Sequence, residues 1–90
     1  MKRIDEFCRR HADAAGHALA WLAEARSAEW RTPEDIRSRF PKASFVGTHV
    51  IFDLRGNRYR LDVRIAYATQ IVSIIRVGTH AEYNRWTFSD

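Results

Sequence analysis

The eight residues that follow a Gly56–Asn57 pair alternate strictly between polar and apolar side chains. A period of two is the geometry of a β-strand that lays one face against a core. A glycine–asparagine pair just before such a run is typical of a two-residue hairpin turn. We therefore expect a hairpin whose return strand buries one parity and exposes the other. The buried parity is Tyr59, Leu61, Val63 and Ile65, and the opposite parity is Arg58, Arg60, Asp62 and Arg64.

The neighbouring segments extend this hairpin into a small antiparallel sheet. Before the turn, Val50, Phe52 and Leu54 alternate with Ile51, Asp53 and Arg55. After a second turn at residues 66–70, the run Ile71–Val77 is apolar on both parities, which favours a central strand covered on both faces. A short strand near Phe45 completes a meander of three or four strands.

Helical spacing dominates the first forty residues or so, where a short first helix is expected over residues 3–11. Asp13 can cap a second helix. A third begins with Thr32 as N-cap and Pro33 at N1, and ends near Arg39 because Pro41 follows. The second helix would use the face Ala15, Ala18, Leu19, Leu22 and Ala25. The fold class expected for residues 1–90 is a single α+β domain, with N-terminal helices on one face of the sheet.

The charge balance favours a polyanionic partner, or an acidic protein. The sequence has 15 lysines and arginines against 11 aspartates and glutamates, a net charge of +4. Only Lys2 and Lys42 are lysines. Arginine binds phosphate with two parallel hydrogen bonds, although a GC-rich genome would give the same bias. The lone Cys8 excludes an intrachain disulfide and a cysteine-based zinc site, and fits a reducing cytoplasm. No apolar run is long enough to cross a membrane.

The arginine parity of the return strand is a candidate surface for nucleic acid. Arg58, Arg60 and Arg64 would project from the face opposite the core, and Arg76 would join them if Ile75 and Val77 point inward. Arginines on paired strands form a positive platform for a phosphate backbone. The same pattern also describes an ordinary solvated outer face, and spacing alone does not separate the two.

Candidate chemistry lies just after Gly78, where His80, Glu82 and Tyr83 follow the last strand. Histidine suits proton transfer near neutral pH, whereas His11, His17 and His49 are expected to be packed or surface residues. The acids of the second half are too few to favour a two-metal nuclease. In metal-free RNA cleavage the 2′-hydroxyl of the substrate is the nucleophile. A base, an acid and cationic groups then suffice.

Two motifs resemble those of a known family. The run Gly56–Leu61 (GNRYRL) and the run Gly78–Tyr83 (GTHAEY) are together similar to HigB-type toxins of the RelE/ParE toxin–antitoxin superfamily. Supporting similarity comes from Trp21, Ala28–Trp30, Thr32–Ile36, Phe40–Ala43 and Ile71–Val72, so the resemblance spans nearly the whole chain.

The resemblance implies a RelE-like fold and an mRNA endoribonuclease that acts free or on the ribosome without a cofactor or metal. It also implies neutralisation by a cognate helix-turn-helix antitoxin, and no membrane partner. His80 and Tyr83 would be catalytic, with Arg60 and Arg76 as phosphate ligands. Further RNA contacts would come from Lys42, Asn57, Arg58, Arg64 and Glu82. Asp62 and Arg64 stand where relatives are expected to be more neutral, so Asp62 either pairs with an arginine or marks an altered groove.

Two other functions fit the same residues. A non-catalytic module could dock RNA or an acidic protein on the arginine face, with His80 purely structural. Alternatively, the chain could belong to the arm of the superfamily that poisons DNA gyrase by protein contact and cuts nothing. A working His80–Tyr83 pair would argue against both.

Overall fold

Helices and strands segregate along the chain in the expected α+β order. The structure, a computed structural model, describes residues 2–88. The elements are α1 (Lys2–Arg10), α2 (Ala12–Ser27), α3 (Pro33–Arg39), β1 (Ser44–Val46), β2 (His49–Leu54), β3 (Tyr59–Ala66), β4 (Ile71–Thr79) and α4 (His80–Tyr83). Among the described residues, no helix has both the length and the apolar character that crossing a membrane requires.

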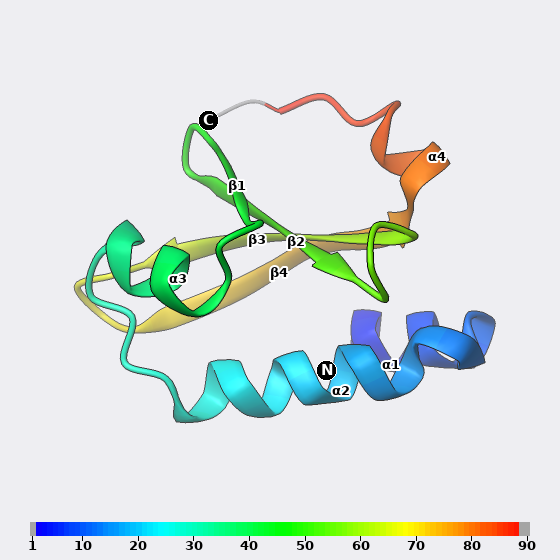
Figure 1. Cartoon of the computed structure of the whole chain (residues 1–90), viewed down its shortest axis with the longest axis horizontal. Coiled ribbons are helices and arrows are strands. Elements are labelled where there is room, and N and C mark those ends of the chain that lie inside the picture. Colours follow the sequence, from blue (N-terminus) through cyan, green and yellow to red (C-terminus); the bar gives the residue numbers. More distant parts are fainter. Residues whose placement is uncertain (1, 89–90) are drawn as a thin grey trace.

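The four strands form one antiparallel sheet in the order β1-β2-β3-β4. Leu61, in the middle of β3, pairs with Phe52 on one side and Val77 on the other. The predicted parity is confirmed, because Tyr59, Leu61 and Val63 are buried against α1 and α2, and Ile65 packs against the same core. Figure 1 shows these helices on one side of the sheet and the C-terminal segment, residues 84–88, on the other. The fold class expected from the sequence is therefore confirmed, with four strands.

The hairpin turn between β2 and β3 is centred on Gly56 and Asn57, as expected, but it comprises the four residues 55–58 and not two, because the last strand pair is Leu54 with Tyr59. The Arg58 N–H donates to the Arg55 carbonyl at 3.4 Å, which closes the turn around these two residues. Gly56 has a φ of +68°, a left-handed conformation that glycine adopts without steric cost. Because this turn sets the register, it decides which residues of β2 and β3 share a face.

The prediction that residues 71–77 form a central strand is wrong, since β4 lies at the edge of the sheet. α1 contacts this strand, and on its other face Trp86 and Phe88 lie over Arg76, whereas Ile71 at its start is 58% exposed. A bulge also changes its inward residues: Asp62 pairs with Arg76 and Val63 pairs with Ile74, so Ile75 is skipped. Ile74 is buried in the core in place of Ile75, while Val77 packs against that core as expected.

The predicted start of the second helix is also wrong and its predicted face is right only in part, whereas the third helix is correct. Asp13 lies inside the first turn of α2, where its carboxylate accepts a hydrogen bond from the Tyr59 hydroxyl at 3.0 Å. Of the predicted face, Ala18 is buried and Leu22 and Ala25 pack against the core. Leu19 is 52% exposed, and the buried large side chain of this helix is Trp21. At α3, Thr32 is the N-cap and Pro33 lies at the start, with a full capping box.

Candidate active site

α4 is a single helical turn that the GTHAEY motif builds and attaches to the hairpin. The Thr79 hydroxyl accepts from the Glu82 N–H at 3.1 Å, and the Glu82 carboxylate accepts from the Thr79 N–H at 2.9 Å. This reciprocal capping box starts the turn. The His80 N–H donates to the Arg58 carbonyl at 2.9 Å, which fixes the turn against the hairpin. Because His80 and Tyr83 are three residues apart on this turn, their rings lie next to each other, with centroids 6.1 Å apart.

Arg60 connects the hairpin to α4. Its guanidinium lies over the Tyr83 ring, 5.2 Å from the centroid, a cation–π contact. Its Nε lies 3.2 Å from the Asp53 carboxylate, and its Nη1 donates to the Asn57 carbonyl at 2.8 Å. The side chain is only 12% exposed. Arg60 therefore orients Tyr83 and has little of its surface left for a ligand.

Arg76 is held between a buried carboxylate and the C-terminal segment. Its Nε donates to Asp62 and its Nη2 donates to the Thr87 carbonyl, both at 2.9 Å. Its guanidinium also lies 4.6 Å from the ring centroid of Trp86 and 4.9 Å from that of Phe88. The contact with Asp62 answers the question that the sequence left open, because this aspartate does pair with an arginine.

Asp62 has a second partner that sequence reasoning missed. Its Oδ1 lies 2.8 Å from Nδ1 of His49, and the side chains are 0% and 7% exposed respectively. His49 was expected only to be packed. The signal was available in the hairpin register, which opposes Ile51 to Asp62 and puts His49 diagonally beside it on the same face.

The outer face is not the open arginine platform that the alternation predicted. Asp62 is fully buried, Arg60 is largely covered, and the aromatic side chains of residues 86 and 88 lie over Arg76. The sequence reasoning failed because it gave the C-terminal segment no position. Arg58 and Arg64 are exposed, and Arg64 donates to the Thr48 hydroxyl at 3.2 Å. Asn57 and Lys42 are exposed too.

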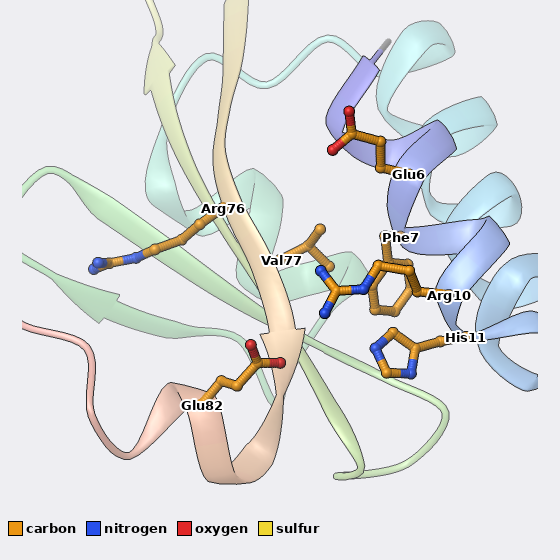
Figure 2. Close-up of a pocket in the computed structure, with 7 residues that line it drawn as sticks. All are labelled: Glu6, Phe7, Arg10, His11, Arg76, Val77 and Glu82. Carbon is orange, nitrogen blue, oxygen red and sulfur yellow. The ribbon is translucent and has the colours of Figure 1, made fainter.

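Glu82 lines a pocket of about 210 Å³ between α1 and the end of β4, together with Arg10, His11 and Arg76. Figure 2 shows the Arg76 side chain pointing to the other side of β4, away from Arg10 and His11. The hydrogen bond from the Thr79 backbone, together with the positive charge of Arg10, holds the pKa of Glu82 below its ordinary value. Glu82 thus serves the cap of α4.

In the part of the chain that the structure describes, no three histidine, cysteine or acidic side chains gather in a way that could hold a metal ion. The chemical groups of the site are instead two arginines, an imidazole and a phenol around α4, with the buried Asp62–His49 pair beside them.

Comparison with known families gives one result. A family model described as HigB_toxin, a RelE-like toxic component of a toxin–antitoxin system, matches residues 14–86. The matched region contains the whole sheet, α4 and Trp86. No curated protein sequence matches the chain significantly.

Proposed function

Because this chain belongs to the HigB family of RelE-like toxins of toxin–antitoxin systems, we propose that it is an endoribonuclease that stops translation by cutting mRNA. The observation that carries the proposal is the cluster at α4. A histidine and a tyrosine lie on one helical turn, and an arginine stacks on the tyrosine. Metal-free RNA cleavage needs a base, an acid and a cationic group, and this small area holds a side chain of each kind.

In the proposed reaction the 2′-hydroxyl of a nucleotide attacks the adjacent phosphorus, which releases the 5′ oxygen of the next nucleotide. His80 can accept a proton when neutral or donate one when charged, and the Tyr83 hydroxyl can donate a hydrogen bond or a proton. Arg76 supplies positive charge where the phosphorane becomes more negative, and Arg60 holds Tyr83 in position beside it. Arg58, Arg64, Asn57 and Lys42 are exposed and would bind the flanking RNA.

The substrate and the partner follow from the same reasoning. We infer that the substrate is message on the ribosome, where a small basic protein is attracted by the surrounding RNA phosphates. Membership of a toxin–antitoxin family implies a cognate antitoxin, for which we propose a helix-turn-helix protein. The proposed reaction uses no cofactor, and since ribosomes and antitoxin are cytoplasmic, we expect the protein to act in the cytoplasm.

The test is to incubate the purified protein with message on translating ribosomes and with the free message, and to map the new RNA ends. Cleavage that leaves a 2′,3′-cyclic phosphate and a 5′-hydroxyl is expected. A message carrying one 2′-deoxynucleotide at the cut position should resist cleavage there. If both RNAs stay intact while the expressed protein causes gyrase-dependent DNA breaks, the chain poisons gyrase instead. If it binds RNA but neither activity is found, it is a binding module.

A further inference from the structure

The buried Asp62–His49 pair has the form of a proton-transfer group. Asp62 accepts from Nδ1 of His49 at 2.8 Å, so the hydrogen of a neutral imidazole lies on Nδ1 and the lone pair lies on Nε2. A carboxylate that fixes the tautomer and orientation of a histidine in this way prepares it to act as a base. Arg76 donates to the other oxygen of Asp62 at 2.9 Å and so supplies a positive charge beside this buried carboxylate.

Nε2 of His49 is buried and has no hydrogen-bond partner among the described residues. Buried polar atoms in folded proteins nearly always have a partner, and the exceptions require an explanation. A purely structural histidine between strands would be expected to use both nitrogens. The group in contact with this ring is instead Phe88, whose ring centroid lies 5.2 Å away in an edge-on arrangement.

Phe88 lies between His49 and α4. Its ring centroid is 6.4 Å from that of Tyr83 on one side and 5.2 Å from that of His49 on the other, and the Arg76 guanidinium lies 4.9 Å away. An aromatic ring flanked by an arginine, a tyrosine and a histidine stands where a nucleobase could stack. The segment that carries this ring has no regular secondary structure after Arg85, and Arg76 ties it to the sheet by donating to the Thr87 carbonyl.

Cleavage through the 2′-hydroxyl is an in-line displacement, so the attacking and leaving oxygens lie on opposite sides of the phosphorus. His80 and Tyr83 stand on one helical turn and therefore approach from one side. On the basis of the function proposed above, we propose that His49, oriented by Asp62, is the base on the opposite side, and that RNA replaces Phe88 between His49 and α4.

In this step the 2′-hydroxyl proton passes to Nε2 of His49 while the 2′ oxygen bonds to phosphorus. The bond from phosphorus to the 5′ oxygen breaks, and the 5′ oxygen receives a proton from charged His80 or from Tyr83. The products are a 2′,3′-cyclic phosphate and a 5′-hydroxyl, and water later returns the two side chains to their starting protonation states.

The test compares single-turnover cleavage by the wild type, His49→Gln and a matched control, His17→Gln, in which an exposed histidine of α2 is changed. Loss of a positioned base lowers the rate by about 10²–10⁴-fold, so His49→Gln should lose this much while binding a 2′-deoxy RNA normally. The control should keep the wild-type rate. Exogenous imidazole should restore cleavage to His49→Gly, a rescue that a merely structural role would not give.

The pH profile gives a further readout. Two charged groups of β3 face His49: Asp62, which contacts its ring, and Arg64, which is the cross-strand partner of His49. From β4, Arg76 contacts the same carboxylate of Asp62. The wild type should show a bell-shaped rate profile, and the limb that rises from acid pH should disappear in His49→Gln. Phe88→Ala should cleave at least as fast as the wild type, because it clears the space that RNA enters.

The outcomes separate the two proposals. A wild type that cuts ordinary but not 2′-deoxy RNA, with a folded His49→Gln that cuts equally fast, would overturn the role of His49 and leave the proposed function standing. A wild type that cuts no RNA would overturn both. If the histidine variants do not fold, wild-type protein bound to a 2′-deoxy RNA decides the matter. NMR signals of the His49 and Phe88 rings should shift on binding, and unchanged signals would contradict the proposal.

Discussion

Gly78 packs closely against the indole ring of Trp86. A Cβ on Gly78 would come 3.2 Å from Cζ2 of Trp86 and 3.0 Å from Oε1 of Glu82, closer than side chains normally approach. The glycine of the GTHAEY motif therefore lets α4 and the residues after it fold back onto the sheet. The Trp86 ring that packs against this glycine also lies over Arg76, with its centroid 4.6 Å from the guanidinium.

The first prediction concerns Gly78→Ala. The added methyl group has to displace Trp86 and Glu82, and overpacking of this kind typically costs about 1–3 kcal/mol. We expect a lower free energy of unfolding in urea and a weaker RNA cleavage activity. The matched control is Gly16→Ala, because a methyl group added to Gly16 in α2 would meet no atom within 4 Å. This change should stabilise the protein by about 0.5–1 kcal/mol. Equal effects at both sites would contradict the close contact with Trp86.

The second prediction concerns the salt dependence of RNA binding. Arg64 is exposed, whereas Arg60 is occupied by Asp53 and by the Tyr83 ring. We therefore expect Arg64→Ala to reduce the slope of log affinity against log salt by about 0.7, the release expected for one contact to single-stranded RNA. Arg26→Ala on α2 is the control and should leave the slope unchanged. Fluorescence anisotropy with a labelled 2′-deoxy RNA measures both, and an unchanged slope for Arg64→Ala would remove this residue from the interface.

The third prediction concerns acid. Hydrogen bonds from the Thr79 backbone lower the pKa of Glu82 in the folded protein from its ordinary value of 4.5. A lowered folded pKa means that the charged carboxylate stabilises the fold above the unfolded pKa, and that this contribution is lost as the pH falls through the folded pKa. Glu82→Gln should therefore be less stable than the wild type at neutral pH, and the difference should shrink below about pH 4.5. Glu29→Gln is the control and should change the stability little, because it breaks only an exposed ion pair with Arg31.

Much of the fold could be predicted because local rules agree there with the tertiary structure. The alternation around Leu61 predicts that the apolar parity is buried, and Thr32–Pro33 is a local start signal for a helix. Neither prediction depends on which elements pack against these residues. Errors arose where tertiary contacts overrode a local pattern. Asp13 is typical of a helix cap, but its carboxylate accepts a hydrogen bond from Tyr59 within the first turn. The apolar run of β4 predicted a central strand, but β4 pairs with β3 alone and lies at the edge of the sheet.

The site was predictable only in part, for a related reason. The helical turn that brings His80 beside Tyr83 follows from the spacing after Gly78. By contrast, the Asp62–His49 contact requires the register of the hairpin, and the position of Phe88 over His49 requires the path of a segment with no periodic pattern. The alternation of residues 58–65 alone therefore predicted an exposed arginine face where the protein has a largely covered one.

The last prediction concerns the chemistry of α4, where Tyr83→Phe separates packing from proton transfer. The centroid of the Tyr83 ring lies 5.2 Å from the Arg60 guanidinium carbon and 5.6 Å from the centroid of the Trp86 ring. A phenylalanine ring keeps both contacts. Only the hydroxyl is lost, so a fall in the rate of cleavage with normal folding assigns a role to that hydroxyl. A positioned acid or base contributes about 10²–10⁴-fold, and we expect losses in this range for Tyr83→Phe and for His80→Ala.

The control for these variants is Tyr67→Phe, a half-buried tyrosine in the turn between β3 and β4, which should cleave message at the wild-type rate. Circular dichroism checks the fold of each variant, and expression without an antitoxin checks growth arrest. Because the His80 backbone N–H holds α4 to the Arg58 carbonyl, His80→Ala keeps the anchor of the helical turn and removes only the imidazole. A folded His80→Ala protein that arrests growth and cuts message at the normal rate would exclude His80 from catalysis. If a folded Tyr83→Phe protein also cuts at the normal rate, the Tyr83 hydroxyl has no role in catalysis. The role of Tyr83 would then be limited to its contact with Arg60.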